Sequence, residues 1–379
     1  MNKLVDFRKE IHSKAELSGN EINTAQLIVS FLQKFNPDTL ITKLGGEGVA
    51  GEFKGMNSGK RVMVRCELDA LPQTETLDIP YASQNSGSAH KCGHDGHMTI
   101  IAGLAERFHK KKPQNGSIVL LFQPAEETGE GALRVLQDEK FKPIEPDYVL
   151  ALHNLPGFPL GEVLLKPDIF ASASEGLHFH LEGKTSHAAE PQEGNSPALA
   201  ISQLIQSFSA LPQFHTPLHD SAQVTVVQAS VGEVAFGTSP GVGDIRITVR
   251  AHKSEILKKL SNQAIEYAEQ IATMYKLKLI TTHHDAFPQT KNNSELIEII
   301  EQSAISKKLK VKQITIPFPW SEDFGNFTEK YQGALFGLGS GENHPALHHP
   351  DYDFPDDLID IGINLFEEII HRLTGNEHV

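Results

Sequence analysis

The segment from Ala89 to His97 gathers side chains that are well suited to binding a metal ion. Its sequence, Ala-His-Lys-Cys-Gly-His-Asp-Gly-His, holds a thiol, three imidazoles and a carboxylate. Thiolate sulfur and imidazole nitrogen are ligands that zinc-like cations prefer. Because Cys92 and His94 cannot surround an ion alone, further ligands must come from elsewhere in the chain. An isolated pair of this kind is more often a polar loop that caps a helix, with the cysteine a small buried side chain.

Other side chains that could bind a metal share one kind of position relative to the predicted strands. Each comes just after, or ends, an apolar run that predicts a buried strand: Asp69 after 61–66, Glu126 and Glu127 after 117–122, His153 after 148–152, and His348 after 334–338. In a parallel sheet the carboxyl ends of the strands lie at the same edge, where ligands bind. We therefore expect these residues to lie close together.

The order of the predicted elements indicates the fold. Strand, polar loop and helix repeat along the chain, and continuous apolar strands are typical of a mostly parallel sheet covered by helices on both faces. A final helix is predicted over 356–373. These features predict an α/β catalytic domain in two parts, residues 1–175 and 286–379.

Residues 176–285 follow a different pattern, which predicts an inserted α+β domain. The predicted elements are a strand at 177–181, a helix at 198–208, strands at 224–231 and 244–250, a helix at 256–271 and a strand at 277–283. This βαββαβ order is that of the ferredoxin-like motif. The ends of such a domain lie close together, as an insertion requires.

Composition excludes several classes of protein. The net charge of −14 disfavours nucleic acid or an anionic membrane as a partner. No apolar run reaches the roughly 18 residues of a membrane span. The two cysteines, Cys66 and Cys92, argue against a disulfide framework and fit a reducing compartment. We expect a soluble, cytoplasmic protein of two domains.

Five candidate ligands are more than one open zinc site uses, and they fit two ions about 3.5–4 Å apart. They are Cys92, His94, Glu127, His153 and His348. The donor types admit zinc or manganese first, and also cobalt or nickel. Asp69 would hold a ligand histidine in its correct tautomer. Glu126 would be the general base, although two adjacent acids are often only a solvated surface pair.

The chain resembles the aminoacylase and hippurate-hydrolase type amidohydrolases, a metallopeptidase-like group that also holds auxin-conjugate hydrolases and N-acetyl-diaminopimelate deacetylases. Its most specific motifs are Cys-Gly-His-Asp-Gly-His at 92–97 and Gln-Pro-Ala-Glu-Glu at 123–127. The likeness continues in other short segments, at 8–12, 16–17, 21, 65–72, 90–91, 122, 183–188, 321–324 and 347–350. The resemblance therefore extends along nearly the whole chain.

The resemblance implies a catalytic domain with a bimetal centre and an inserted domain that commonly mediates dimerisation. It assigns the same five ligands and the base Glu126. It also implies that His187, on the inserted domain, helps to stabilise the oxyanion, in its own or in the partner subunit. Arg246 stands at a position that resembles an arginine of the family. It could receive a substrate carboxylate, for which the guanidinium fork is suited, or it could be an ordinary strand-edge arginine.

Three positions depart from the family pattern. Glu67 stands where the family usually has aspartate, and Lys91 replaces a small residue beside Cys92. Gly237 stands where relatives usually carry an asparagine that faces the substrate. The contacts between substrate and the inserted domain are therefore the part of the resemblance that is least secure.

We expect a metal-dependent amidohydrolase that cleaves small N-acyl amino acids or related conjugates by means of a metal-bound hydroxide. The alternative is a metallo-dipeptidase or carboxypeptidase with the same bimetal centre. A catalytically silent metal-binding protein is a second rival, against which the intact base and ligand set argue. A structural zinc protein does not fit, because Cys66 and Cys92 belong to no Cys-x-x-Cys pair.

Overall fold

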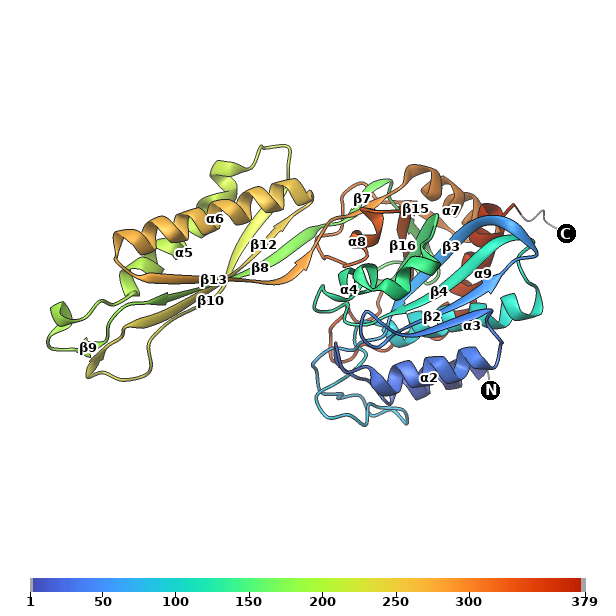
Figure 1. The fold of residues 1–379 in the computed structure, drawn as a ribbon, viewed down its shortest axis with the longest axis horizontal. Coiled ribbons are helices and arrows are strands. Elements are labelled where there is room, and N and C mark those ends of the chain that lie inside the picture. The colour runs from blue at the N-terminus through green and yellow to red at the C-terminus, as the bar shows by residue number, and fades with distance from the viewer. Residues whose placement is uncertain (1–2, 376–379) are drawn as a thin grey trace. The chain divides into compact units, whose positions relative to one another are not determined.

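The computed structural model describes residues 3–375 and divides them into two units (Figure 1). The first unit holds the described residues through Phe170, Thr290–Pro317 and the described residues from Asp323 onward. The second unit holds Ala171–Gln289 together with Phe318–Glu322. Among the described helices, none combines the length and the apolar character needed to cross a membrane.

An eight-stranded sheet is the centre of the first unit. In order across the sheet, its strands are β1 (Thr39–Leu44), β2 (Gly48–Lys54), β4 (Asn115–Gln123), β3 (Asn57–Glu67), β5 (Tyr148–Pro156), β16 (Gln332–Gly341), β6 (Val163–Leu165) and β15 (Val311–Gln313). The four middle strands β4, β3, β5 and β16 pair in parallel. The mostly parallel sheet predicted from the sequence is therefore confirmed. The short strands β1, β2, β6 and β15 are additions that the apolar pattern did not predict.

Helices pack around this sheet, and most residues of its middle strands are buried on both faces. The helices of the first unit are α1 (Lys3–His12), α2 (Ile22–Gln33), α3 (His94–Lys110), α4 (Gly131–Gln137), α7 (Ser294–Ser306), α8 (Gly325–Thr328) and α9 (Asp357–Leu373). Val62, Met63 and Val64 of β3 have no exposed surface, although successive side chains of a strand point to opposite faces. Burial on both faces explains why the sequence shows continuous rather than alternating apolar runs.

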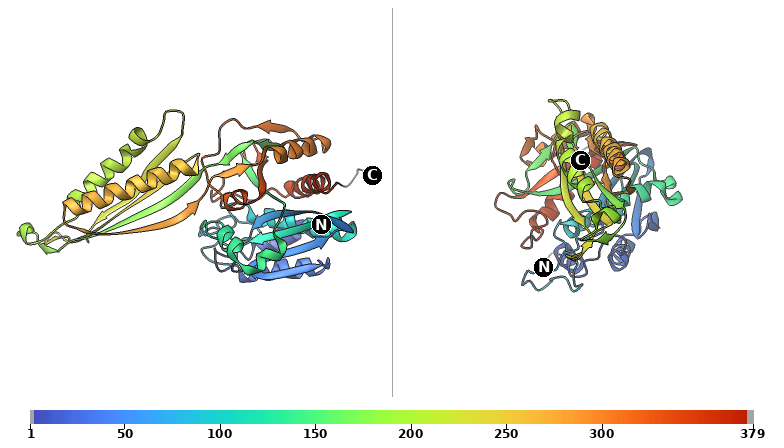
Figure 2. Two further views of the ribbon diagram at one scale, coloured as in Figure 1. Left: turned by 45° about the horizontal axis from the view of Figure 1, so that its top comes forward. Right: turned by 90° about the vertical axis from the view of Figure 1, so that its left-hand side faces the viewer.

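The second unit is a four-stranded antiparallel sheet covered by two helices. Its elements are β8 (Ala173–Glu182), α5 (Ala198–His215), β10 (Ala222–Val231), β12 (Val242–Ala251), α6 (Ser254–Met274) and β13 (Lys278–Phe287). The strand order β10-β12-β8-β13 and the βαββαβ sequence are those of the predicted ferredoxin-like fold. Figures 1 and 2 show α5 and α6 side by side along one face of this sheet.

Two small strand pairs and two 3-10 helices, Glu139–Ile144 and Pro191–Glu193, complete the described structure. β9 (Ser186–His187) pairs with β11 (Thr238–Ser239), and β7 (Asp168–Ala171) pairs with β14 (Thr290–Asn292). The sequence pattern predicted none of these short strands, because two to four residues are too few to show a period.

Gly116 is needed where β4 begins to pair with β3. Its backbone is left-handed, with φ +75°, and a Cβ there would lie 2.0 Å from the carbonyl oxygen of Lys60. Gly87 has a similar φ of +77° but has no atom within 4 Å of the Cβ position. A comparison of alanine substitutions at these two glycines can therefore separate the cost of backbone strain from the cost of steric overlap.

We predict that Gly116→Ala lowers the free energy of unfolding more than Gly87→Ala does. The left-handed backbone alone costs about 1–2 kcal/mol in either variant, and only Gly116→Ala adds a backbone clash. Chemical denaturation of both variants measures the difference. Equal losses of stability would show that β3 and β4 can move apart at no cost.

Candidate metal centre

The candidate site forms at the carboxyl edge of the parallel strands. Asp69 follows β3, Glu126 and Glu127 follow β4, and His153 lies near the end of β5. Cys92 lies just before α3, whose first residue is His94. His348 comes from the loop between β16 and α9.

Cys92, His94 and His153 form a buried donor group. One ligand atom from each side chain lies within 4.8 Å of the other two. Cys92 Sγ is 3.5 Å from His153 Nε2. The three residues are only 7%, 1% and 5% exposed, respectively. These atoms are close enough to share one ion after small side-chain movements.

A second donor group consists of Cys92, Glu127 and His348, whose ligand atoms also lie within 4.8 Å of one another. Cys92 belongs to both groups. His348 is more exposed than the other ligands, and its backbone N–H donates to the Lys91 carbonyl oxygen at 2.8 Å. The structure thus brings together all five ligands predicted from the sequence, in two groups that share one sulfur.

Hydrogen bonds fix which nitrogen of each buried histidine is available to an ion. Nδ1 of His94 donates to the carbonyl oxygen of Asp69 at 2.8 Å, and Nδ1 of His153 donates to the carbonyl oxygen of Asn154 at 2.9 Å. In the neutral form of each ring, the lone pair is therefore on Nε2. His94 Nε2 is buried and has no hydrogen-bond partner among residues 3–375. A metal ion would satisfy this atom, so the donor set fits a metal.

Burial sets the protonation states of two ligands. It lowers the pKa of His153 to about 3, with His97 as the next cause, so the imidazole is neutral as a ligand must be. It raises the pKa of the Cys92 thiol to about 12, with the Glu127 carboxylate as the next cause. A cation beside the sulfur reverses this effect and favours the thiolate.

Asp69 organises the loops rather than binding His94 through its carboxylate. Its Oδ2 accepts from Ser18 Oγ at 2.6 Å and from the Glu127 N–H at 2.9 Å. Its Oδ1 lies 3.7 Å from His94 Nδ1, whereas its own carbonyl oxygen lies 2.8 Å from that nitrogen. The main chain of Asp69 thus makes the contact that we had expected from its side chain.

Ala125, which comes just before Glu126 and Glu127, has a left-handed backbone conformation. Ala125 has φ +51°, and its N–H donates to Glu21 Oε1 at 2.8 Å. Glu126 Oε2 and Glu127 Oε1 lie 3.9 and 3.8 Å from His94 Nε2. A left-handed alanine is strained, and such strain persists only where the surrounding structure enforces it.

A buried network behind His94 was not predicted from the sequence. His97 Nδ1 lies 2.7 Å from Glu67 Oε2, and Glu67 also pairs with Arg65. Arg65 Nη2 lies 2.5 Å from Asp323 Oδ1. Burial alone would raise the pKa of Glu67, but Arg65 and His97 hold it well below its usual range. Glu67, which appeared only as a departure from the family, is thus an ionised partner of His97.

A second missed network lies beneath the Cys92 loop. Lys91 is fully buried, and its Nζ contacts Glu75 Oε1 at 2.6 Å and donates to the Tyr352 carbonyl oxygen at 2.9 Å. His12 Nδ1 lies 2.8 Å from Asp95 Oδ2, and its Nε2 lies 2.9 Å from Glu75 Oε2. Burial opposes the charge on His12, but hydrogen bonds to Asp95 and Glu75 raise its pKa to about 9. The loop is therefore held by charges of both signs.

The remaining predicted residues belong to the second unit. His187 is exposed, and its Nδ1 accepts the N–H of Ala189 at 3.0 Å, which leaves the proton of the neutral ring on Nε2. Arg246 Nη1 donates to Gln228 Oε1. Around Gly237, the space that a Cβ would occupy is open.

Curated relatives match nearly the full chain. An N-acetyl-L-cysteine deacetylase of Bacillus subtilis (strain 168) is 31% identical over 382 residues, covering 99% of this chain and 89% of that protein. A hippurate hydrolase of Campylobacter jejuni is 30% identical over 357 residues, covering 93% and 92%. An N-acetyldiaminopimelate deacetylase of Bacillus subtilis (strain 168) is 29% identical over 384 residues, covering 99% and 98%.

Solved structures share the fold. A dinuclear metal-binding peptidase of the M20 family from Bacillus subtilis has a TM-score of 0.82 at 23% identity, covering 99% of this chain and 98% of that chain. An aminobenzoyl-glutamate utilization protein from Klebsiella pneumoniae has a TM-score of 0.76 at 18% identity, covering 100% and 97%. At these identities the likeness concerns the fold alone.

The family described as Peptidase family M20/M25/M40 matches residues 63–372, a range that includes all five candidate ligands and Glu126. This match and the curated relatives confirm the resemblance to N-acyl amino acid hydrolases. The chain is therefore a member of peptidase family M20/M25/M40.

Proposed function

We propose that this protein is a metal-dependent amidohydrolase that cleaves the amide bond of small N-acyl amino acids. The observation that carries the proposal is the pair of donor groups that share Cys92, with Glu126 beside His94. The names of the relatives support the substrate class, because they describe two deacetylases and a hippurate hydrolase.

Two divalent ions are proposed as cofactors, one for each donor group. Support comes from the buried Nε2 of His94 and from a structural relative that is described as dinuclear. Such ions would lower the pKa of a bound water and polarise the scissile carbonyl group. Zinc or manganese are our first choices, with cobalt or nickel also compatible with thiolate, imidazole and carboxylate donors.

Glu126 is proposed to move the proton during hydrolysis. Its carboxylate takes a proton from the attacking water and then gives it to the leaving amine. Glu127 would hold an ion instead, so that adjacent glutamates divide the two tasks. Asp69 holds the backbone N–H of Glu127 and, through its own carbonyl oxygen, the ring of His94.

Two residues of the second unit are proposed to act on the substrate. His187 would donate from Nε2 to the developing oxyanion, and the hydrogen bond from Ala189 to Nδ1 supports that tautomer. Arg246 would receive the substrate carboxylate, unless it serves only its partner Gln228. A homodimer in the cytoplasm is proposed as the working form. The family resemblance supports the dimer, and the two free, buried thiols, Cys66 and Cys92, support a reducing compartment.

The first test is a substrate panel for the purified, metal-loaded chain. N-acetyl amino acids and hippurate are compared with dipeptides and with peptides that offer a free carboxyl terminus. We expect kcat/KM for the best N-acyl amino acid to exceed that for every peptide by at least about tenfold, a difference that pocket contacts can supply. Faster cleavage of a dipeptide would favour the metallo-dipeptidase alternative.

The second prediction concerns the proton carrier. Glu126→Gln keeps the size of the side chain but removes the base, so we expect kcat to fall by about 10²–10⁴ while both ions stay bound. Elemental analysis and steady-state kinetics measure the two effects. The control is Glu130→Gln in the same loop, where the carboxylate is exposed and pairs with Arg134. Activity of Glu126→Gln within a few-fold of the wild type would reject the assignment.

A further inference from the structure

The uncovered face of the four-stranded sheet carries a histidine–aspartate cluster. His178 and His180 lie two residues apart on β8, so their side chains point to the same face. The alternate residues Leu177 and Phe179 are buried in the apolar core with α5 and α6. The two histidines therefore lie on the face opposite these helices. Their side chains are 20% and 30% exposed.

Asp244 of β12 lies directly across from His180 in the strand register. Its Oδ1 is 2.7 Å from His178 Nε2 and 2.8 Å from His180 Nδ1. Both imidazoles thus converge on one oxygen, and all three ligand atoms lie within 4.8 Å of one another. Around a tetrahedral zinc with bonds of about 2.0–2.1 Å, ligand atoms lie about 3.3 Å apart. Small side-chain rotations would open the cluster to that spacing.

We propose that His178, His180 and Asp244 form a further metal site, which binds one divalent transition ion of the zinc, cobalt or nickel type. Two imidazoles and one carboxylate suit these ions, whereas calcium and magnesium require more oxygen ligands. All three ligands belong to the second unit. The site shares no residue with the two donor groups around Cys92.

Charged side chains of both signs lie beside the cluster. Glu182 Oε1 lies 3.6 Å from His180 Nε2, which is beyond hydrogen-bond distance but close enough for its negative charge to favour a cation at this histidine. Lys278 holds the other oxygen of Glu182 at 2.9 Å. Arg246, the next outward residue on β12, donates to Gln228 of β10. Arg246 also lies directly across from His178 in the register of β12 and β8, but its Nη1 is held by Gln228 on the other neighbouring strand, β10.

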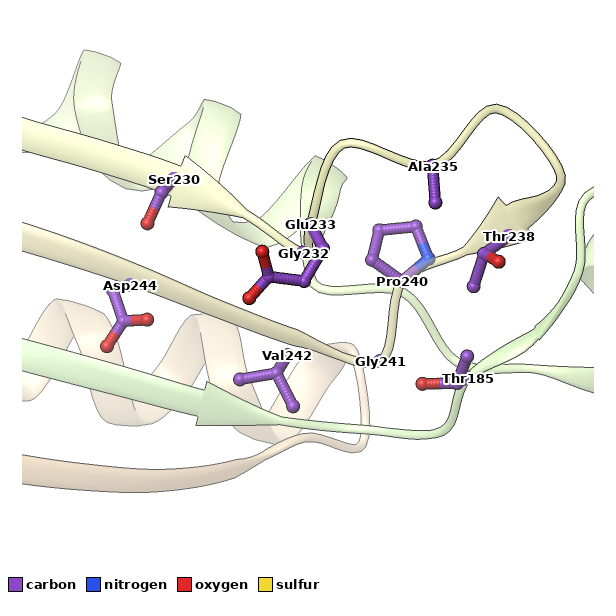
Figure 3. Close-up of a pocket in the computed structure, with 10 residues that line it drawn as sticks. All are labelled: Thr185, Ser230, Gly232, Glu233, Ala235, Thr238, Pro240, Gly241, Val242 and Asp244. Atoms are coloured by element: carbon purple, nitrogen blue, oxygen red, sulfur yellow. The ribbon is translucent and has the colours of Figure 1, made fainter.

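The cluster adjoins a hollow that can admit a further ligand. Asp244 and Ser230 are among the residues that line a cavity of about 490 Å³ at one end of the sheet (Figure 3). Three protein ligands leave one position of a tetrahedral ion open. Water or a small anion in the hollow could take this position. The rings of His178 and His284, whose centroids are 6.3 Å apart, place another imidazole nearby.

The test counts zinc ions on the full-length chain. The protein is stripped with a chelator, dialysed against a zinc buffer at neutral pH and analysed for zinc per chain. We expect His178→Ala/His180→Ala to lose one ion relative to the wild type. The matched control, His219→Ala/His283→Ala, removes two exposed histidines of the same unit and is expected to lose none. This difference does not depend on how many ions the Cys92 groups bind.

A second variant tests whether the loss of zinc could result from misfolding of the double variant. Asp244→Asn keeps the shape of the side chain and is expected to lose the same ion, with an unchanged circular dichroism spectrum. Anomalous diffraction from zinc-loaded crystals should then place an ion against His178 Nε2 and His180 Nδ1 in the wild type. Equal zinc content in the wild type and the His178→Ala/His180→Ala variant would overturn the proposal. So would an equal loss in the control, which would indicate binding to surface histidines in general.

Discussion

Everything at the candidate centre depends on the register of the parallel strands. Cys66 of β3 pairs with Phe122 of β4, and Arg65 pairs with Ala151 of β5, so the three strands end at a common edge. The chain then leaves each strand into a loop that carries donors. A slip of one residue would turn every side chain of a strand to the opposite face. Close packing of side chains of different sizes on both buried faces resists such a slip, and it thereby positions residues that are far apart in the sequence.

Several carboxylates are buried at this edge of the sheet, and ion pairs and hydrogen bonds compensate for the cost of burying them. Asp69, Glu67 and Asp95 have no exposed surface. Arg65 and His97 contact Glu67, and hydrogen bonds from the main chain and from Ser18 reach Asp69. Removing one partner of a buried ion pair typically costs about 3–5 kcal/mol, because the other charge is left uncompensated. These pairs hold the ligand side chains in position before an ion arrives, which is what a tight metal site requires.

The sequence alone predicted the fold class and the candidate ligands because both follow local rules. Continuous apolar runs identify buried strands, and polar residues directly after them, such as Glu126 and His153, identify the edge. Partners of Lys91 and Glu67 could not be found in this way, because the contacts of a buried charge depend on residues far away in the chain. His97 offered a usable signal, since it lies one helical turn after His94. The hydrogen bond from His94 to the main chain of Asp69 left no signal, because any residue has a carbonyl oxygen.

The most direct test of the central claim is the crystal structure of the chain loaded with manganese or zinc, with the ions located by anomalous scattering. We expect two ions about 3.5–4 Å apart beside Glu126. One should contact His94 and His153 and the other Glu127 and His348, with Cys92 between the groups. A single ion at this edge, or ions bound only elsewhere on the chain, would contradict the account.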